Sequence, residues 1–317
     1  MKQVILGILV FAFCAGSILL VRTGRVEAVA PRILVKDIPE YGVRIAGPGD
    51  PIHQTLSTAF KTPGSNPIFE RLKPFSAFLR NTGSQNIVAY WLTWELMKPD
   101  GTFVTRGEGG VNAGVLTGDV SPGLEGLVMN SGYGVGKNAD RLITPLNSFG
   151  EGDMSTGLFS YASSTDNQSR IAQMQEAAQS IPSFLDNVVV PELREYVEIR
   201  VSVDGVFFDD GTFVGPDTTH FFSKVQASVD AKRDLLEEMS FAREHGLSLS
   251  RVFKNVQEVA SSPDVSSFGT QADHYNYHKK IYAQELLRIR QTLGDERALA
   301  QAVRSLRRPW PKLHKIT

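Results

Sequence analysis

The sequence EYVEIRVSVDGVFFDDGTFVG at residues 195–215 holds the clearest strand pattern in the chain and ends in an Asp-Gly turn. Apolar and polar residues alternate through its first half, as in a strand with one buried face, and the apolar positions are Val197, Ile199, Val201 and Val203. Asp-Gly tolerates the left-handed backbone of a tight turn, and Thr and Val favour an outgoing strand. The stretch therefore predicts a strand, a turn and a returning strand.

The same turn sequence occurs twice, as PDGTFV at 99–104 and as DDGTFV at 209–214. Two copies, each after an apolar strand, favour a shared β-hairpin geometry. The alternative is a Ca²⁺ loop, because hard cations bind several carboxylate oxygens, and its ligands would be Asp204, Asp209, Asp210 and Asp217. The spacing of an EF-hand, with glycine at the sixth position and glutamate at the twelfth, is absent. We therefore expect no cofactor, with Ca²⁺ as the alternative.

Residues 75–107 read FSAFLRNTGSQNIVAYWLTWELMKPDGTFVTRG and predict three strands of an antiparallel meander. NTGSQN and KPDG separate apolar runs that are rich in aromatic and β-branched residues. One face of the middle strand is predicted to be core and carries Val88, Tyr90, Leu92, Trp94 and Leu96. The other face is more polar and carries a single large aromatic residue, Trp91.

The region before this meander is less regular. Residues 31–72 are rich in proline and glycine around two short candidate strands, YGVRIAG at 41–47 and TLSTAF at 55–60. The pattern is typical of an irregular entry to a β domain, which we place at residues 31–220.

Three further segments lie between the meander and the strand at 195–215. Residues 106–136 are unusually rich in glycine and predict long loops with at most a short strand near GLVM. Residues 139–146 predict another strand. A helix is predicted near 169–184, inserted between the later strands.

From about residue 222, apolar residues recur every three or four positions instead of every second position, which predicts helices. One such repeat comprises Tyr282, Leu286, Ile289 and Leu293. The pattern breaks at EHGLS, where Ser248 is a candidate N-cap, at SSPDVSSFGT and near LGDE. We therefore expect a C-terminal helical region of three or four helices at 222–308, followed by a basic tail at 309–317.

Residues 4–21 contain no charged residue and indicate an export signal or a membrane anchor. Small residues before position 28 are compatible with cleavage there, so residues 1–28 are either a signal peptide or an N-terminal membrane anchor. The only cysteine, Cys14, lies inside this segment, which excludes disulfides and cysteine-ligated zinc from the rest of the chain. We expect an extracytoplasmic protein that is secreted, periplasmic or anchored to the membrane by residues 4–21.

Composition excludes some classes of protein. The chain has 317 residues, of which 42% are hydrophobic and 21% charged, as in ordinary globular proteins. Its formal net charge is -1, which gives no general field to attract nucleic acid. We therefore expect no nucleic-acid partner.

Few motifs point to chemistry. His274 and His278 are spaced to lie on one face of a helix within reach of one metal ion, but no third ligand follows at the next turn. GYGVGK at 132–137 lacks the glycine and the Ser or Thr that a phosphate-binding loop requires. No Gly-x-Ser-x-Gly elbow occurs. The two histidines are candidates for packing or surface positions first and for metal ligands second.

Two tryptophans are candidates for partner binding. Trp91 stands alone on the polar strand face, where it is either a platform for a sugar or a cover for a neighbouring element. Trp310 lies among basic residues in the tail, where it either contacts anionic lipid or a partner, or docks beside a solvated helix end.

Residues 68–215 resemble the immunoglobulin-like or fibronectin-III-like sandwiches of exported bacterial proteins. The resemblance is carried by PFSAFLRNTGSQNIVAYWLTWELMKPDGTFV, where a turn joins two strands and an aromatic-rich strand follows. It implies a module that binds, spaces or scaffolds, and it carries no catalytic residue.

The expected fold is therefore α+β. An N-terminal membrane or export helix precedes an antiparallel Ig-like β-sandwich with a long Gly-rich loop, and a C-terminal helical region follows. The first functional hypothesis is a non-enzymatic binding or scaffold module of the cell envelope, with a protein or glycan partner. The alternative is an extracytoplasmic hydrolase or metal-dependent enzyme with its site near the Asp209 hairpin.

Overall fold

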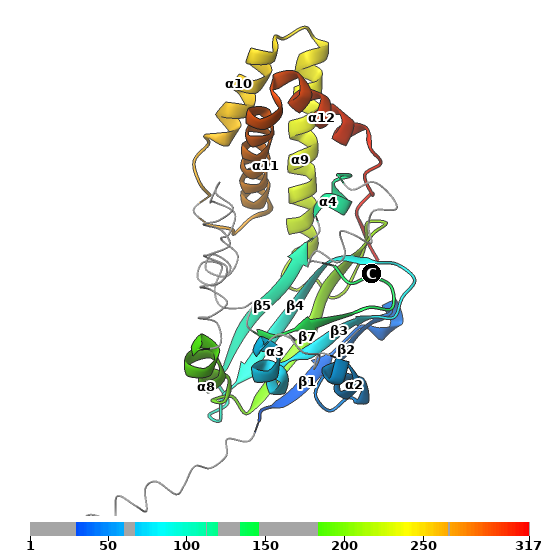
Figure 1. Cartoon of the computed structure of the whole chain (residues 1–317), viewed down its shortest axis with the longest axis vertical. Coiled ribbons are helices and arrows are strands. Elements are labelled where there is room, and N and C mark those ends of the chain that lie inside the picture. The colour runs from blue at the N-terminus through cyan, green and yellow to red at the C-terminus, as the bar shows by residue number, and fades with distance from the viewer. Residues whose placement is uncertain are drawn as a thin grey trace, which may run out of the picture.

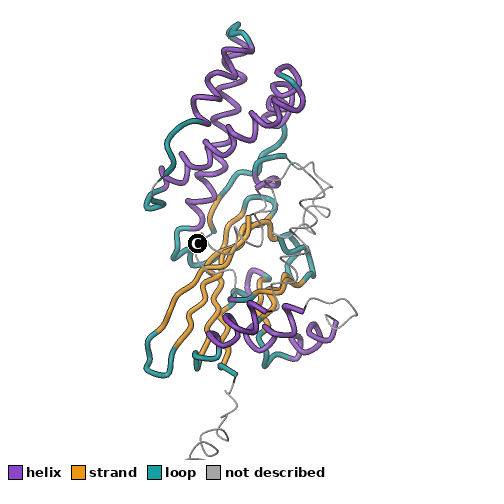
Figure 2. Tube along the Cα trace, turned by 60° about the vertical axis from the view of Figure 1, so that its left-hand side comes forward, coloured by secondary structure: helices purple, strands orange, loops and turns teal. Residues whose placement is uncertain are grey.

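A computed structural model describes residues 30–59, 67–111, 113–119, 134–145, 183–265 and 267–316. The molecule is elongated, with two β-sheets toward one end and a group of four helices at the other (Figure 1). Figure 2 shows the same division from another side. The prediction of a mixed α+β fold is confirmed.

The larger sheet has six strands in the order β5-β4-β7-β8-β9, with β1 beside the first half of β7. Its strands are β1 (Arg32–Lys36), β4 (Ile87–Met97), β5 (Phe103–Val111), β7 (Glu198–Phe208), β8 (Thr212–Val214) and β9 (His314–Lys315). The β4–β5 and β7–β8 pairs are the two predicted hairpins, and both are confirmed. In each turn the aspartate before the glycine accepts a hydrogen bond from the threonine after it, at 2.9 Å in both copies.

The smaller sheet has the order β2-β3-β6, and its strands are β2 (Val43–Ala46), β3 (Ala77–Asn81) and β6 (Asp140–Ile143). Its apolar face packs on the larger sheet to form one core. The larger sheet contributes Tyr90, Leu92, Trp94, Leu96, Ile199, Val201 and Val203 to that core. Burying each of these side chains contributes about 1.5–3 kcal/mol, so this shared core is the main stabilising contact of the β part.

Several predictions about the strands are wrong. The sheets are not purely antiparallel, because β1 pairs with β7 and β9 with β8 in parallel. The three strands of 75–107 are not one meander, because β3 belongs to the smaller sheet and the NTGSQN segment crosses between the sheets. The Asn81 side chain holds that crossing by donating to the carbonyls of Gln85 and Val135, at 2.7 and 3.0 Å. Val88 lies on the opposite face from Tyr90, because the register shifts between Ile87 and Ala89.

The start of the Gly-rich segment is a strand, not a loop, because β5 extends to Val111. Trp91 on β4 lies across Gly107 and Gly109 of β5, and a Cβ atom at either glycine would overlap its indole ring. The ring therefore provides the side-chain packing that the glycines lack, as aromatic residues do beside glycines in other sheets.

A helix covers the outer face of the smaller sheet. α2 (Pro51–Ala59) packs Ile52 and Leu56 on Phe78, so the prediction of a strand at 55–60 is wrong. Apolar and buried positions four residues apart favour the helix there. The remaining short elements are η1 (Pro39–Tyr41), α3 (Pro67–Leu72), η2 (Lys73–Phe75), α4 (Ala113–Leu116), η4 (Leu185–Val189) and α8 (Val190–Leu193).

The helical region comprises α9 (Phe221–Glu244), α10 (Leu249–Ala260), α11 (Gln271–Leu293) and α12 (Asp295–Arg307), which confirms the predicted helices and their breaks. These helices enclose a core of their own, separate from the core between the sheets. Ser248 caps α10 by accepting from the Arg251 amide, and Thr270 forms a capping box with Asp273 on α11. The tail then returns to the sheet as β9.

Some predictions lie outside the described residues. These are the N-terminal segment at 4–21 with Cys14, most of the helix near 169–184, and the middle of the Gly-rich segment. In the ranges that the structure describes, none of the helices has the length and apolarity needed to cross a bilayer.

The contact of Trp91 with β5 predicts that Gly107→Ala destabilises the protein by about 1–3 kcal/mol, because the new methyl group must displace the indole. Urea unfolding of the purified protein measures the cost. Gly49→Ala is the matched control, since a Cβ there has no atom within 4 Å. Adding Trp91→Leu to Gly107→Ala should remove part of the penalty. Equal costs at Gly107 and Gly49 would contradict the packing role of the ring.

Candidate functional site

Asp204, the first of the predicted Ca²⁺ ligands, is a buried residue on β7. Its Oδ1 accepts from the amide and hydroxyl of Thr218, and its Oδ2 accepts from the same two groups of Thr219. Burial raises the pKa of Asp204, but these hydrogen bonds outweigh it and hold the pKa below its ordinary value. Both oxygens are used to anchor the turn that precedes α9.

Asp217 lies close to Asp204 in space and belongs to the same turn before α9. Its amide donates to the carbonyl of Asp204 at 2.8 Å, and its carboxylate accepts from the Phe222 amide at 2.9 Å. Lys315 of the tail forms an ion pair with it at 3.1 Å. Asp217 therefore holds the start of α9 and the end of the chain together.

Asp209 and Asp210 lie in the β7–β8 turn and hold a neighbouring turn in place. Asp209 accepts from the side chain of Asn86 at 2.8 Å, and Asp210 accepts from that of Gln85 at 2.6 Å. Among the residues described, His, Cys, Asp and Glu do not form a group of three or more that could hold a metal ion. The structure brings Asp204 and Asp217 together and assigns the other two to the hairpin.

His274 and His278 lie in an aromatic cluster at the start of α11. Phe268 contacts His274 at 5.2 Å between ring centroids, and Tyr277 contacts His278 at the same distance. Burial, together with the neighbouring His274, lowers the pKa of His278 to about 4. The His278 ring also stacks on Tyr282 at 6.2 Å, so it is a packed side chain.

The two candidate tryptophans both contact other parts of this chain. Trp91 packs on Phe221 of α9 at 5.7 Å, with Lys224 over its ring. Trp310 donates from Nε1 to the carbonyl of Ser305 at 3.0 Å, and Arg233 of α9 lies over its ring at 5.0 Å. Trp91 thus joins the sheet to the helical region, and Trp310 joins the tail to it.

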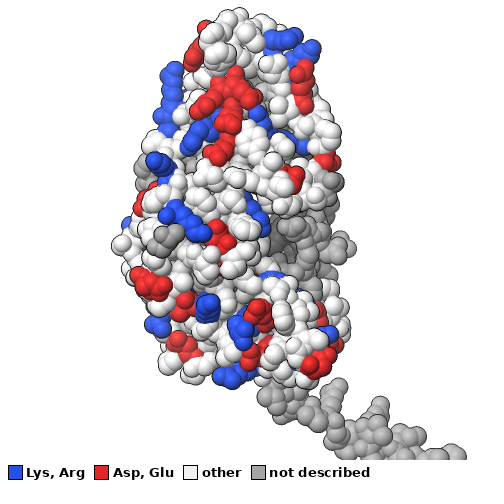
Figure 3. All heavy atoms as spheres, turned by 180° about the vertical axis from the view of Figure 1, so that it is seen from behind, with Lys and Arg blue, Asp and Glu red and all other residues white. Residues whose placement is uncertain are grey.

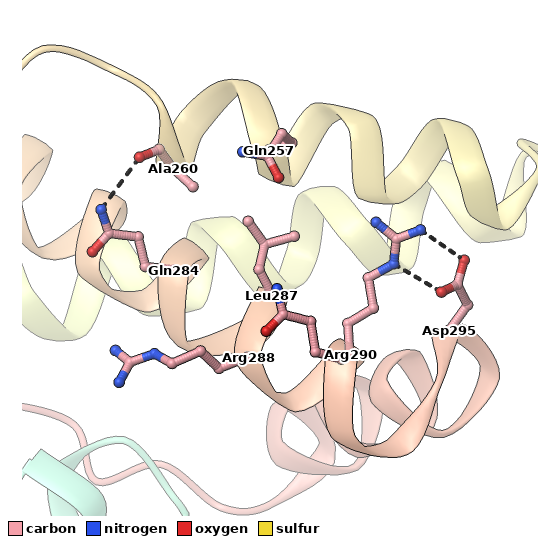
Figure 4. Close-up of a pocket in the computed structure, with 8 residues that line it drawn as sticks. Gln257, Ala260, Gln284, Leu287, Arg288, Arg290 and Asp295 are labelled. Atoms are coloured by element: carbon pink, nitrogen blue, oxygen red, sulfur yellow. Dashed lines mark hydrogen bonds and ion pairs between the residues drawn. The ribbon is translucent and has the colours of Figure 1, made fainter. Parts of the chain in front are cut away.

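The structure adds a site that the sequence analysis missed, a pocket of about 700 Å³ where α10, α11 and α12 meet (Figure 4). It is open to solvent and has a mostly polar lining. The lining residues are Gln257, Ala260, Gln284, Leu287, Arg288, Arg290, Gln291 and Asp295.

The two arginines of this pocket differ in their surroundings. Arg290 donates two hydrogen bonds to the Asp295 carboxylate, at 2.8 and 3.1 Å, and its guanidinium lies 4.7 Å from the centre of the Phe253 ring. Arg288 is exposed, and within the described part of the chain it forms no ion pair. Figure 4 shows the two side chains extending in opposite directions, with the guanidinium of Arg290 at Asp295.

The glutamines give the pocket directed polar groups. Gln284 donates from Nε2 to the Ala260 carbonyl at 3.3 Å, which links α11 to the end of α10. Gln257 lies within hydrogen-bond distance of the Ser261 hydroxyl, at 3.1 Å. Leu287 and Ala260 supply the apolar part of the lining.

A weak signal for this site exists in the sequence. Gln284, Arg288 and Gln291 recur at steps of four and three, which places them on one side of α11, and Asp295 lies at the start of α12. A polar stripe on a helix is normally a solvated face, so the pattern alone does not indicate a pocket. The pocket requires α10, whose position depends on tertiary packing.

Comparison with known proteins gives no relative of this chain. No family model matches it, and neither a curated protein nor a solved structure matches it.

The Asp204 geometry predicts a large effect of Asp204→Asn. Asparagine keeps one acceptor oxygen, and its amide nitrogen would face the Thr219 donors, so we expect a loss of about 1–3 kcal/mol in the free energy of unfolding at pH 7. Because the pKa of Asp204 is lowered on folding, the wild type should lose this contribution as the pH falls below about 4, through the folded-state pKa.

Asp100→Asn is the matched control, because Asp100 makes similar hydrogen bonds to Thr102 at an exposed turn. We expect it to change stability by less than about 0.5 kcal/mol. Urea unfolding between acid and neutral pH measures both variants. An Asp204→Asn protein as stable as the wild type at pH 7 would show that the junction does not depend on the carboxylate.

The lowered pKa of His278 predicts a second pH effect. Between its ordinary value of 6.5 and about 4, the unfolded chain binds a proton that the folded protein excludes, so stability falls as the pH falls through this window. His278→Gln should flatten the dependence of the melting temperature on pH. Burial also lowers the pKa of His53, so part of the slope should remain. An unchanged slope in His278→Gln would contradict this assignment.

Proposed function

We propose that this protein is an exported, envelope-associated binding or scaffold module without enzymatic activity, and that its helical region presents the pocket to a protein partner. The observation that carries the proposal is the position of the pocket, on the helical region and away from the end where the described chain begins (Figure 1). The expected export or anchor segment at 4–21 precedes that end.

The strand directions explain this placement. Arg32 of β1 lies beside Glu198, at the start of β7, whereas Phe207 near its end contacts Phe221 at the start of α9. The 11 residues of β7 rise roughly 35 Å, and the 24 residues of α9 rise roughly 36 Å. A chain held at its N-terminus would therefore hold the pocket several tens of ångströms from that point.

The groups in the pocket favour binding over catalysis. Its described lining includes no Ser, Thr, Cys, Lys or His side chain, and the carboxylate of Asp295 is held by two hydrogen bonds from Arg290. Hydrogen bonds from Arg290 hold the pKa of Asp295 below its usual value, whereas a general acid or base works best with a pKa near the operating pH. An ion pair held within the protein and neutral amide side chains are groups that bind a ligand and do not react with it.

The enzyme alternative near the Asp209 hairpin has less support. Its carboxylates are already used, by Asn86 and Gln85 in the turn and by Thr218 and Thr219 at Asp204. In this proposal the sheets act as a spacer, the role that the resemblance of residues 68–215 to immunoglobulin-like modules implies. The face seen in Figure 3 carries both signs of charge side by side, which gives no support to a nucleic-acid partner.

Photo-crosslinking in the native host tests the proposal. A photoreactive phenylalanine analogue replaces Gln291 in the pocket, and in a matched variant it replaces Gln301, which is exposed on α12 outside the pocket. We expect a crosslinked protein band in the envelope fraction from position 291 and a much weaker one from position 301. Equal labelling at both positions, or recovery of the protein in the cytoplasmic fraction, would contradict the proposal.

A further inference from the structure

We propose that the pocket of α10, α11 and α12 binds a carboxylate of an acidic peptide segment, with Arg288 as the residue that receives it. The inference rests on the proposed function, because it names the chemistry of the partner that this pocket would recognise.

Arg288 supplies the cation. The guanidinium of Arg290 is occupied by Asp295 and packed on Phe253, so its charge is compensated within the protein. Arg288 has no such partner among the described residues, and its planar fork can donate two parallel hydrogen bonds to one carboxylate. The pocket thus offers one guanidinium with its donors available.

The glutamines supply acceptors for N–H groups of a ligand. The Ala260 carbonyl can only accept a hydrogen bond, so Gln284 must present its Nε2 there, and its amide oxygen is left to accept another. A peptide has both partners that this arrangement requires, a side-chain carboxylate for Arg288 and main-chain N–H groups for the amide oxygens. The methylene groups of an acidic side chain can pack on Leu287 and Ala260.

The same groups argue against a phosphate. A phosphate binds best where several donors or cations converge, and within the described lining Arg288 is the one guanidinium whose charge no carboxylate of the protein compensates. A free uronic acid shares the carboxylate chemistry but provides hydroxyl groups in place of amides. An open pocket suits a ligand that continues beyond it, as a segment of a protein does.

The described lining itself carries a favourable charge. It includes two guanidinium groups, Arg288 and Arg290, and one carboxylate, Asp295, which leaves an excess of one positive charge. Such a local excess attracts an acidic partner and raises the rate of association, with an effect that weakens as salt is added.

Fluorescence anisotropy with the purified full-length protein in detergent tests the inference. The probe is a fluorescein-labelled peptide of alternating glutamate and glycine, and the matched peptide has glutamine in place of glutamate. We expect the glutamate peptide to bind more tightly than the glutamine peptide and Arg288→Gln to weaken its binding about tenfold or more. Arg304→Gln, at an exposed position of α12 outside the pocket, should change the affinity less than about twofold.

The inference is overturned if the two peptides bind equally, if Arg288→Gln and Arg304→Gln have the same effect, or if oligogalacturonate or inorganic phosphate displaces the probe better than unlabelled glutamate peptide does. Circular dichroism confirms that each variant is folded. A pocket-specific crosslink without binding of the glutamate peptide would reject the ligand class and leave the binding function standing. Failure of both experiments would reject both proposals.

Discussion

The contact between the Asp204 carboxylate and the Thr218–Thr219 turn is the constraint on which the two halves of the molecule depend. β8 follows β7 in the larger sheet and ends at Val214, and α9 begins at Phe221, so the chain must change from strand to helix over residues 215–220. Asp217 and His220 both adopt positive φ angles there. A buried carboxylate that accepts four hydrogen bonds provides the energy to hold such a turn.

The C-terminal tail restrains the helical region from a second direction. Trp310 packs between α9 and the segment around Gly118, and its indole would overlap a side chain at that glycine. The chain then adds β9 to the sheet, and Lys315 pairs with Asp217 at the junction. The helical region is thus tied to the sheet at both its beginning and its end, which fixes the direction in which the pocket faces.

The polar groups near the sheets serve stability, whereas those of the pocket on the helical region are available for recognition. Near the sheets, the acidic side chains that first suggested chemistry are saturated by hydrogen bonds from the protein itself, as with Asp204 and Asp209. On the helical region, Arg288 and the amide oxygen of Gln284 retain capacity for a ligand. Polar groups that are already satisfied hold a fold together, whereas groups with unused donors and acceptors can pay for the desolvation of a partner.

The sequence by itself determined the local elements. The alternation of apolar and polar residues predicted β7, and the repeated Asp-Gly-Thr-Phe-Val predicted both hairpin turns. The glycines and the N-cap Ser248 predicted where the C-terminal helices begin and end. These signals are local, because side-chain periodicity and turn chemistry act over a few neighbouring residues. Tertiary structure alone decided that β3 leaves the meander, that Trp91 stabilises a glycine-rich strand and that Arg288 faces a pocket. Each of these depends on a contact between segments far apart in the chain, and the free energy of such a contact is not encoded in the pattern of either segment.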